Sequence, residues 1–139
     1  MQSVFVLCQN YPSEKDKYPM AFVHPRIKEY LKTGLDVKVI SFACNCPYIY
    51  DEVRVYTLQA GKELLQKSEK AILIAHAPNI KNHLSFILKI WKYLDRLILF
   101  FHGHEVLSTK KYYPRPYDFN KAAKREYRFL RLYDQIKLP

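Results

Sequence analysis

The segment LILFFHGHEVL, residues 97–107, places five apolar residues directly before His-Gly-His-Glu. Its first part is typical of a β-strand at the centre of a sheet, because every side chain in it is large and apolar. Its second part carries three ionisable side chains within four positions, His102, His104 and Glu105. Such a cluster is expected where an inner strand ends at the edge of a sheet that binds ligands.

Four other segments have the character of strands, being short, rich in β-branched or aromatic residues and bounded by polar or turn residues. They are SVFVLCQ (3–9), DVKVISF (36–42), EVRVYTL (52–58) and AILIAH (71–76), and the fifth predicted strand is LILFFH (97–102). Strands one, four and five are almost wholly apolar, which is typical of strands buried on both faces. The segment 42–50 is predicted to be a loop.

Two segments between these strands have helical periodicity. The first helix is predicted to begin at residues 21–24, because Pro25 is tolerated only in a first turn, and to stop at Gly34. The second is predicted over residues 80–94, with Asn79 as its cap and apolar residues three or four positions apart. His83 lies inside this helix and is expected to be structural.

The alternation of strands and helices predicts an α/β fold: one Rossmann-like three-layer domain over residues 1–139, with a mainly parallel sheet in the order 3-2-1-4-5. In such sheets ligands bind beyond the carboxyl ends of the strands, where the strand order reverses. That edge is expected to carry polar residues from three loops, namely Gln9, Asn10 and Tyr11, His76 to Asn79, and His102 to Glu105.

The residues after the fifth strand permit several chemistries. His102 suits a general base or a hydrogen-bond donor to a sugar or phosphate oxygen. His102, His104 and Glu105 together also permit a metal site, although a further ligand at recognisable spacing is absent from the sequence. Gly103 is one of only three glycines and stands where the backbone passes close to a ligand or takes a positive φ. The alternative is that these side chains only cap the strand and its loop.

Several other kinds of site are not indicated. The first loop, QNYPSEKDKYP, contains no glycine, which argues against a nicotinamide or flavin dinucleotide. This loop is longer than most connections of its kind, so we expect it to overhang the edge and to be functional or mobile. Cys44 and Cys46 lack the further Cys or His ligands of a metal site. His24 is interpreted equally well as a ligand contact or as a structural residue of the helix start.

Charge and cysteine usage indicate the partners and the compartment. The formal net charge is +10, which favours an anionic partner. In the last third, a basic amphipathic pattern places five residues on one side of a helix that is predicted to face a membrane: Lys121, Lys124, Arg125, Arg128 and Arg131. The alternative is a core-packing helix with a solvated basic face. Three cysteines without a disulfide pattern, and no long apolar window, predict a cytoplasmic protein that does not cross a membrane.

Five motifs in order resemble the amino-terminal half of the bacterial family 4 glycosyltransferases of GT-B fold. They are Tyr11-Pro12, the helix with Phe22 that ends near Gly34, DVKVIS, AILIAHAPN and ILFFHGHEV. The resemblance implies two Rossmann-like domains facing a cleft, with the acceptor bound mostly by the first and the nucleotide-sugar donor by the second. It implies a retaining sugar transfer without a bound metal, at the inner face of the membrane, in cell-surface polysaccharide synthesis.

Residue by residue, the resemblance implies that His102 is the catalytic histidine of the cleft. It places His76, Asn10 and Tyr11 among the residues that bind acceptor or donor, together with Gly103, His104 and Glu105. The glycines that approach the donor diphosphate in the family's first loop are absent here, and so is the carboxyl-terminal donor-binding domain. We therefore expect a domain of a longer chain that is inactive alone and binds no cofactor itself.

Two alternatives remain open from the sequence. One is a non-catalytic basic α/β module that binds nucleic acid or an anionic membrane, although no stacked aromatic nucleic-acid motif supports nucleic acid as a partner. The other is a metal-dependent hydrolase that uses His102, His104 and Glu105. The sequence does not indicate the sugar, the linkage or the oligomeric state.

Overall fold

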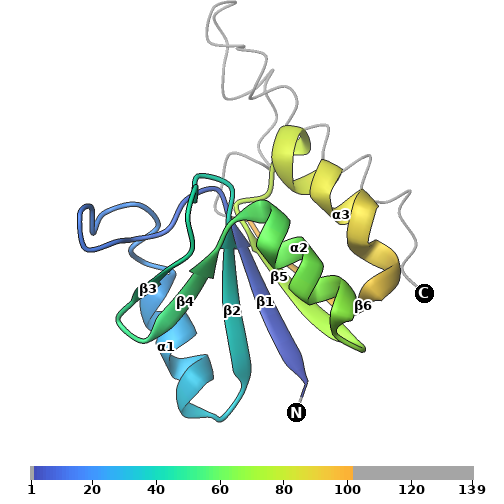
Figure 1. The fold of residues 1–139 in the computed structure, drawn as a ribbon, viewed down its shortest axis with the longest axis horizontal. Helices are drawn as coiled ribbons and strands as arrows, with labels where there is room; N and C mark the ends of the chain where they lie inside the picture. Colours follow the sequence, from blue (N-terminus) through green and yellow to red (C-terminus); the bar gives the residue numbers. More distant parts are fainter. Residues whose placement is uncertain (1, 102–139) are drawn as a thin grey trace, which may run out of the picture.

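A computed structural model describes residues 2–101, and the fold is given for these residues. Six strands and three α-helices follow one another along the chain (Figure 1). Their bounds are β1 (Ser3–Cys8), α1 (His24–Lys32), β2 (Asp36–Ser41), β3 (Tyr48–Tyr50), β4 (Val53–Tyr56), α2 (Leu58–Lys67), β5 (Ala71–His76), α3 (Ser85–Ile90) and β6 (Leu94–Phe100). The fold is α/β with a mostly parallel sheet and is consistent with a Rossmann-like domain.

The strands form one sheet in the order β3-β4-β2-β1-β5-β6. β1 pairs in parallel with β2, from Ser3 opposite Asp36 to Cys8 opposite Ser41, and with β5 on its other side. The predicted order 3-2-1-4-5 corresponds to β4-β2-β1-β5-β6 and is confirmed. The chain first builds β1, β2 and β4 in one direction and then β5 and β6 in the other, so the order reverses between β1 and β5.

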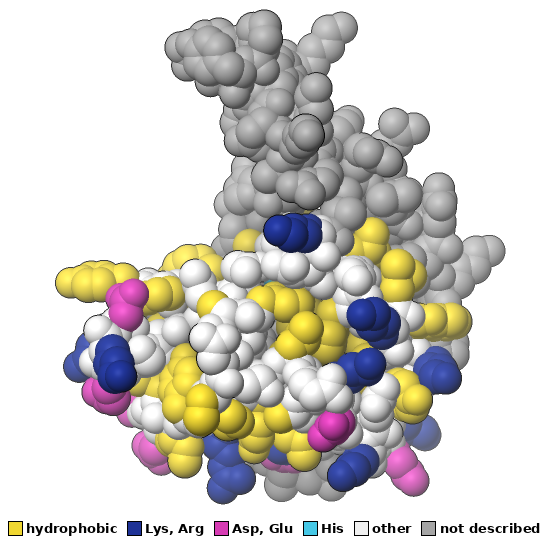
Figure 2. Space-filling view, turned by 45° about the horizontal axis from the view of Figure 1, so that its top comes forward, with side chains coloured by type: hydrophobic (Ala, Val, Ile, Leu, Met, Phe, Trp, Pro, Cys, Tyr) yellow, Lys and Arg dark blue, Asp and Glu magenta, His cyan; other side chains and the backbone are white. Residues whose placement is uncertain are grey.

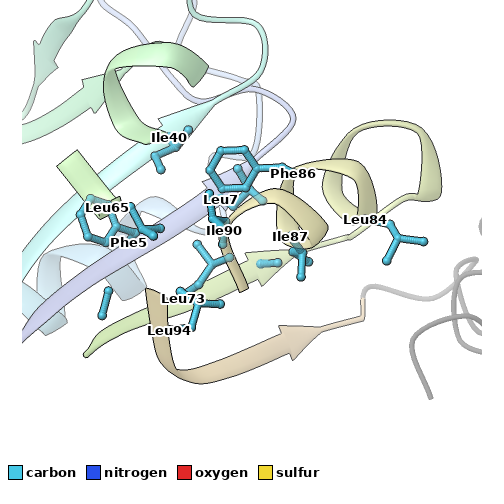
Figure 3. Packing of buried hydrophobic residues seen from close by; sticks show 12 residues of the cluster. Phe5, Leu7, Ile40, Leu65, Leu73, Leu84, Phe86, Ile87, Ile90 and Leu94 are labelled. Atoms are coloured by element: carbon cyan, nitrogen blue, oxygen red, sulfur yellow. The ribbon is translucent and has the colours of Figure 1, made fainter. Parts of the chain in front are cut away.

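Helices cover both faces of the sheet, which gives three layers. On one face, α2 and α3 pack on strand residues such as Phe5, Leu7 and Leu73. Figure 3 shows these side chains directed toward Leu65 of α2 and toward Ile87 of α3. On the other face, Ile27 of α1 packs with valines and other apolar residues of β1, β2 and β4. Burial of both faces explains why β1 and β5 are almost wholly apolar.

α1 begins and ends as its sequence predicts. Pro25 stands in the first turn, where its missing N–H costs no hydrogen bond. After the helix, Gly34 has a φ of +85°, which a residue with a side chain adopts only at a cost.

The predicted helix over residues 80–94 is present but is not a single α-helix. It starts as a π-helical segment, Ile80–Leu84, continues as α3 and ends in a 3₁₀ turn, Trp91–Tyr93. The π-helical start is visible in the bond from the Leu84 N–H to the Asn79 carbonyl, which spans five residues at 3.0 Å. Asn79 is the cap, as predicted.

Three elements differ from the prediction. The prediction of a loop over 42–50 is wrong at its end, because β3 pairs antiparallel with β4 through a two-residue turn. α2 was not predicted, and the third predicted strand is shorter than residues 52–58 because Thr57 caps this helix. The fifth predicted strand begins earlier, at Leu94. It is the edge strand of the described sheet, with half-buried rather than buried side chains over its second half, because no further described strand pairs with it.

Candidate functional site at the carboxyl edge

The carboxyl ends of β1 and β5 lie side by side where the strand order reverses. This edge lies away from the N-terminus in Figure 1. Gln9 and Asn10 follow β1, and Ala77 to Asn79 follow β5. Ala77 has a φ of +47°, an uncommon conformation for a residue with a side chain, and its N–H donates to the Phe100 carbonyl at 2.9 Å. The chain therefore leaves β5 in a sharp turn that is hydrogen-bonded to the end of β6.

Three amide side chains meet at this reversal. The side-chain oxygen of Asn79 caps the π-helical segment by accepting from the N–H groups of Asn82, at 2.7 Å, and His83, at 3.4 Å. Asn82 Nδ2 in turn donates to Gln9 Oε1 at 2.8 Å, and Asn79 Nδ2 lies 3.5 Å from the same oxygen. Such amides carry both donors and acceptors, which suits them to hydroxyl-rich ligands.

Two histidines lie beneath this edge. His76, at the end of β5, is 2% exposed, and its ring stacks on Phe100 with centroids 4.9 Å apart. His83 is fully buried and accepts a hydrogen bond at Nδ1 from the Asn79 N–H at 3.2 Å. Burial, and to a smaller extent the neighbouring His76, lowers the pKa of His83 to about 4. His83 is thus a neutral, internal residue at pH 7, in agreement with the structural role predicted for it.

A cleft of about 710 Å³ opens at the same edge, and Asn10, the residue after Gln9, lines it. One wall is the loop after β1 and the other is the loop between β2 and β3. The lining residues are Asn10, Tyr11, Ser13, Glu14, Lys15, Asp16, Pro19, Ser41, Ala43, Cys44, Asn45, Cys46, Tyr48 and Ile49. Most of them are uncharged, several are polar or aromatic, and the cleft volume falls within the usual range of ligand sites.

Tyr11 connects this cleft to α1 and to the β3–β4 turn. Its hydroxyl lies 2.6 Å from His24 Nδ1, and His24 Nε2 lies 2.8 Å from Asp51 Oδ2. The hydrogen bond from His24 lowers the pKa of Asp51, and the charge of Lys28 lowers it further. Burial raises the pKa of Tyr11 far above its ordinary value, so its hydroxyl remains protonated. His24 was interpreted equally well as a ligand contact or as a structural residue of the helix start. Its two hydrogen bonds within the fold agree with the structural interpretation.

Tyr48 and the two cysteines belong to the other wall. The Tyr48 hydroxyl is positioned to donate to the carbonyls of Tyr11, at 3.2 Å, and Pro12, at 2.9 Å. The Cys44 thiol donates to the Cys46 carbonyl at 3.1 Å. Within residues 2–101, no group of three or more His, Cys, Asp or Glu side chains is arranged to hold a metal ion.

The structure brings together some of the predicted site residues. Asn10 and Tyr11 line the cleft, and His76 lies beneath the neighbouring edge. The other predicted site residues lie outside the described residues: His102, Gly103, His104, Glu105, Lys121, Lys124, Arg125, Arg128 and Arg131. The sequence interpretation missed Asn82, Tyr48 and Asp51. Only Asn82 had a local signal, because it stands three residues after the helix cap, on the same turn.

The surface around the edge shows where charge is placed. Figure 2 turns this side of the molecule forward, and hydrophobic and uncharged side chains occupy the middle of the described surface while Lys and Arg lie mostly toward its periphery. No helix within residues 2–101 is long and apolar enough to cross a membrane.

No protein-family model matches the chain, and comparison with curated proteins and with solved structures gave no significant match.

Proposed function

We propose that this chain is the acceptor-side domain of a retaining glycosyltransferase, which moves a sugar from a nucleotide-sugar to a glycan or lipid-linked acceptor. The observation that carries the proposal is the position of the cleft, which lies at the carboxyl edge of a sheet with Rossmann-like strand order, between the loops that follow β1 and β2. The proposal includes action in the cytoplasm at the inner face of the membrane, in cell-surface polysaccharide synthesis.

The side chains of the cleft have the chemistry that carbohydrate binding requires. Asn10, Asn45 and Ser13 offer donors and acceptors for sugar hydroxyls. Tyr48 lines the same space and offers an aromatic surface for the apolar face of a sugar ring. The charged lining residues are two acids and one lysine, so a neutral glycan fits this wall better than a phosphate does.

The nucleotide-sugar donor is proposed to bind to a second domain of the same protein. The loop after β1 has no glycine and presents Glu14 and Asp16, which does not favour a diphosphate at this position. His102, two residues after the end of β6, is proposed as the catalytic residue. Gly103, His104 and Glu105 are proposed to contact acceptor or donor, and the basic residues 121–131 to face the membrane.

The first test is turnover of the native protein. Its mass in the source cells, measured with an antibody against this chain, is expected to exceed twice 16.6 kDa, the mass of this chain. With that protein, release of nucleoside diphosphate from a panel of nucleotide-sugars measures transfer. His102→Ala should lower kcat at least a hundredfold with little change in KM, the range expected for a general base. Lys89→Ala, an exposed change on α3, is the control, and unchanged turnover in His102→Ala would remove His102 from the mechanism.

The second test is binding by the chain itself. Soluble mono- to trisaccharides that contain glucose, galactose or N-acetylglucosamine should perturb amide NMR signals of residues 10–16 and 43–48. Asn10→Ala and Asn45→Ala should weaken this binding, whereas Gln59→Ala on α2 should not. Perturbations confined to other residues would contradict the assignment of the cleft.

The formal net charge of +10 supports a second candidate, a non-catalytic module that binds nucleic acid or an anionic membrane. Binding to DNA, RNA or phosphatidylglycerol vesicles that falls steeply with salt concentration, with no saccharide binding, would favour it.

A further inference from the structure

Three residues from distant parts of the fold form one hydrogen-bonded chain. Tyr11 comes from the loop after β1, His24 is the first residue of α1, and Asp51 lies in the turn between β3 and β4. The two bonds measure 2.6 and 2.8 Å. One neutral tautomer of His24 satisfies both: Nδ1 accepts from the Tyr11 hydroxyl, and Nε2–H donates to the Asp51 carboxylate. Hydrogen bonds thus connect Tyr11 to Asp51 through His24.

The bond at Tyr11 is needed because the tyrosine is buried. Its side chain is only 5% exposed, and a buried hydroxyl without a partner costs free energy. The ring of His24 also packs edge-on against Tyr11 and lies 4.9 Å from the ring of Tyr50. The position of His24 therefore determines where Tyr11, and with it the first wall of the cleft, is held.

The β3–β4 hairpin binds the same loop at a second point. Tyr48 in β3 donates its hydroxyl to the backbone carbonyls of Tyr11 and Pro12. One end of the hairpin therefore contacts the backbone of the loop directly, while its turn reaches the side chain of Tyr11 through His24.

The turn that presents Asp51 adopts an unusual conformation. Asp51 and Glu52 have φ values of +47° and +71°, a geometry for which hairpins normally use Asn-Gly. Lys28 of α1 holds the turn, because its ammonium donates to the Asp51 carbonyl at 2.9 Å and to Glu52 Oε1 at 3.1 Å. α1 thus contacts the turn twice: Lys28 holds its backbone and Glu52, and His24 bonds to the Asp51 carboxylate.

We propose that His24 and Asp51 are positioning residues of the cleft, with Asp51 fixing the loop after β1 through His24 and Tyr11. The inference rests on the proposed function only for the identity of the ligand. The chain of contacts itself predicts how the loop responds to substitutions, whatever the cleft binds.

The test is hydrogen exchange of the amides of residues 10–23 in single and double variants. His24→Phe removes both hydrogen bonds but keeps a ring, and Tyr11→Phe removes only the hydroxyl. Either change should accelerate exchange in this loop about tenfold, the effect expected for one buried hydrogen bond. Glu52→Gln is the matched control, since it removes a charge from the same turn, keeps an oxygen that can accept from Lys28 and does not touch His24.

The decisive observation is the coupling between Tyr11 and Asp51, which do not hydrogen-bond to each other. Asp51→Asn should accelerate loop exchange threefold or more in the native background and should have a much smaller effect in the Tyr11→Phe or His24→Phe background, where only the Asp51–Lys28 contact remains to be weakened. Equal effects of Asp51→Asn in all three backgrounds would overturn the proposal. The ¹⁵N signals of the His24 imidazole provide a second reading: they should report one tautomer in the native chain and a mixture in the Tyr11→Phe/Asp51→Asn double variant. A single unchanged tautomer in the double variant would count against the hydrogen bonds of His24 to Tyr11 and Asp51.

The same variants separate this inference from the proposed function. If the exchange coupling is present and the saccharide panel binds, His24→Phe should weaken saccharide binding and Glu52→Gln should not. If the coupling is present and no saccharide binds, the positioning role stands and the carbohydrate assignment fails. If the coupling is absent and saccharides bind normally, the carbohydrate assignment stands and the positioning role fails.

Discussion

Asn82 Nδ2 donates to Gln9 Oε1 at 2.8 Å, across 73 positions of sequence, and so connects the end of β1 to the start of the helix that follows β5. These are the two strands between which the strand order reverses. The bond lies at the surface and joins the loop after β1 to the helix start after β5, which a ligand at this edge would meet together.

Substitution of either partner should reveal this coupling. Gln9→Ala and Asn82→Ala should each lower the free energy of unfolding by less than about 1 kcal/mol, because the bond is exposed. Their effects should be non-additive by about 0.5 kcal/mol, as measured by urea denaturation. Gln59→Ala is the control, because the Gln59 side chain is exposed and bonds to Glu63 one turn further along α2. Strict additivity would show that the bond does not form in solution.

The cap at Asn79 should contribute more than the Gln9–Asn82 bond. Asn79→Ala removes the acceptor for two backbone N–H groups and should cost about 1 kcal/mol of unfolding free energy. Asn79→Asp keeps an oxygen at the same position and should cost much less. Equal losses in the two variants, measured by thermal unfolding at pH 7, would show that the side-chain oxygen is not the capping group.

The order of the inner strands was predictable because it depends on a strong local signal and a general topological rule. The segments 3–9, 36–42 and 71–76 are apolar over most of their length, and right-handed crossovers leave few ways to arrange parallel strands. Asn79 was predictable for a similar reason, since a cap residue acts on its own helix. The loop after β1 was predicted from its length to be functional or mobile, which stays a prediction; its residues line the cleft.

The elements that were missed are determined by tertiary contacts. β3 has only three residues and follows Pro47, and its turn contains Asp51-Glu52 instead of Asn-Gly, so no hairpin signal was present. α2 contains Gly61 in its first half, which weakens a helical pattern. The hydrogen bonds of Tyr11, His24 and Asp51 join three elements, and a single sequence gives no indication of such proximity.

Acid should destabilise the protein through His83. Its pKa is about 4 in the folded protein and about 6.5 in the unfolded chain, so both states hold a neutral ring above pH 6.5. As the pH falls from 6.5 to 4, the unfolded state gains a proton that the folded state does not accept, and stability is lost. The loss from this residue should be about 3 kcal/mol at pH 4.

The variant His83→Asn tests this assignment, because it keeps an acceptor for the Asn79 N–H but does not titrate. Urea denaturation at intervals between pH 7.5 and 4 should show a smaller fall in unfolding free energy for the variant than for the native protein. Parallel curves would mean that His83 does not cause the acid sensitivity.

Gly61 should be essential for the packing of α2 on β2. A Cβ at this position would lie 2.5 Å from Ile40 Cγ1 and 2.8 Å from its Cδ1, and Ile40 is fully buried, so its side chain has no room to move aside. Gly61→Ala should therefore lower the unfolding free energy by about 1–3 kcal/mol, despite the better helix propensity of Ala.

In the Ile40→Ala background the clash is absent, so Gly61→Ala should become neutral or stabilising by up to about 1 kcal/mol. Gly34→Ala is the matched control: no atom lies within 4 Å of its Cβ position, and its cost, which comes from the φ of +85°, should be the same in both backgrounds. Equal costs of Gly61→Ala with and without the Ile40 side chain would show that α2 does not lie this close to β2. Chemical denaturation of the three single and two double variants gives the answer, because a change in Cm at constant m reports stability alone.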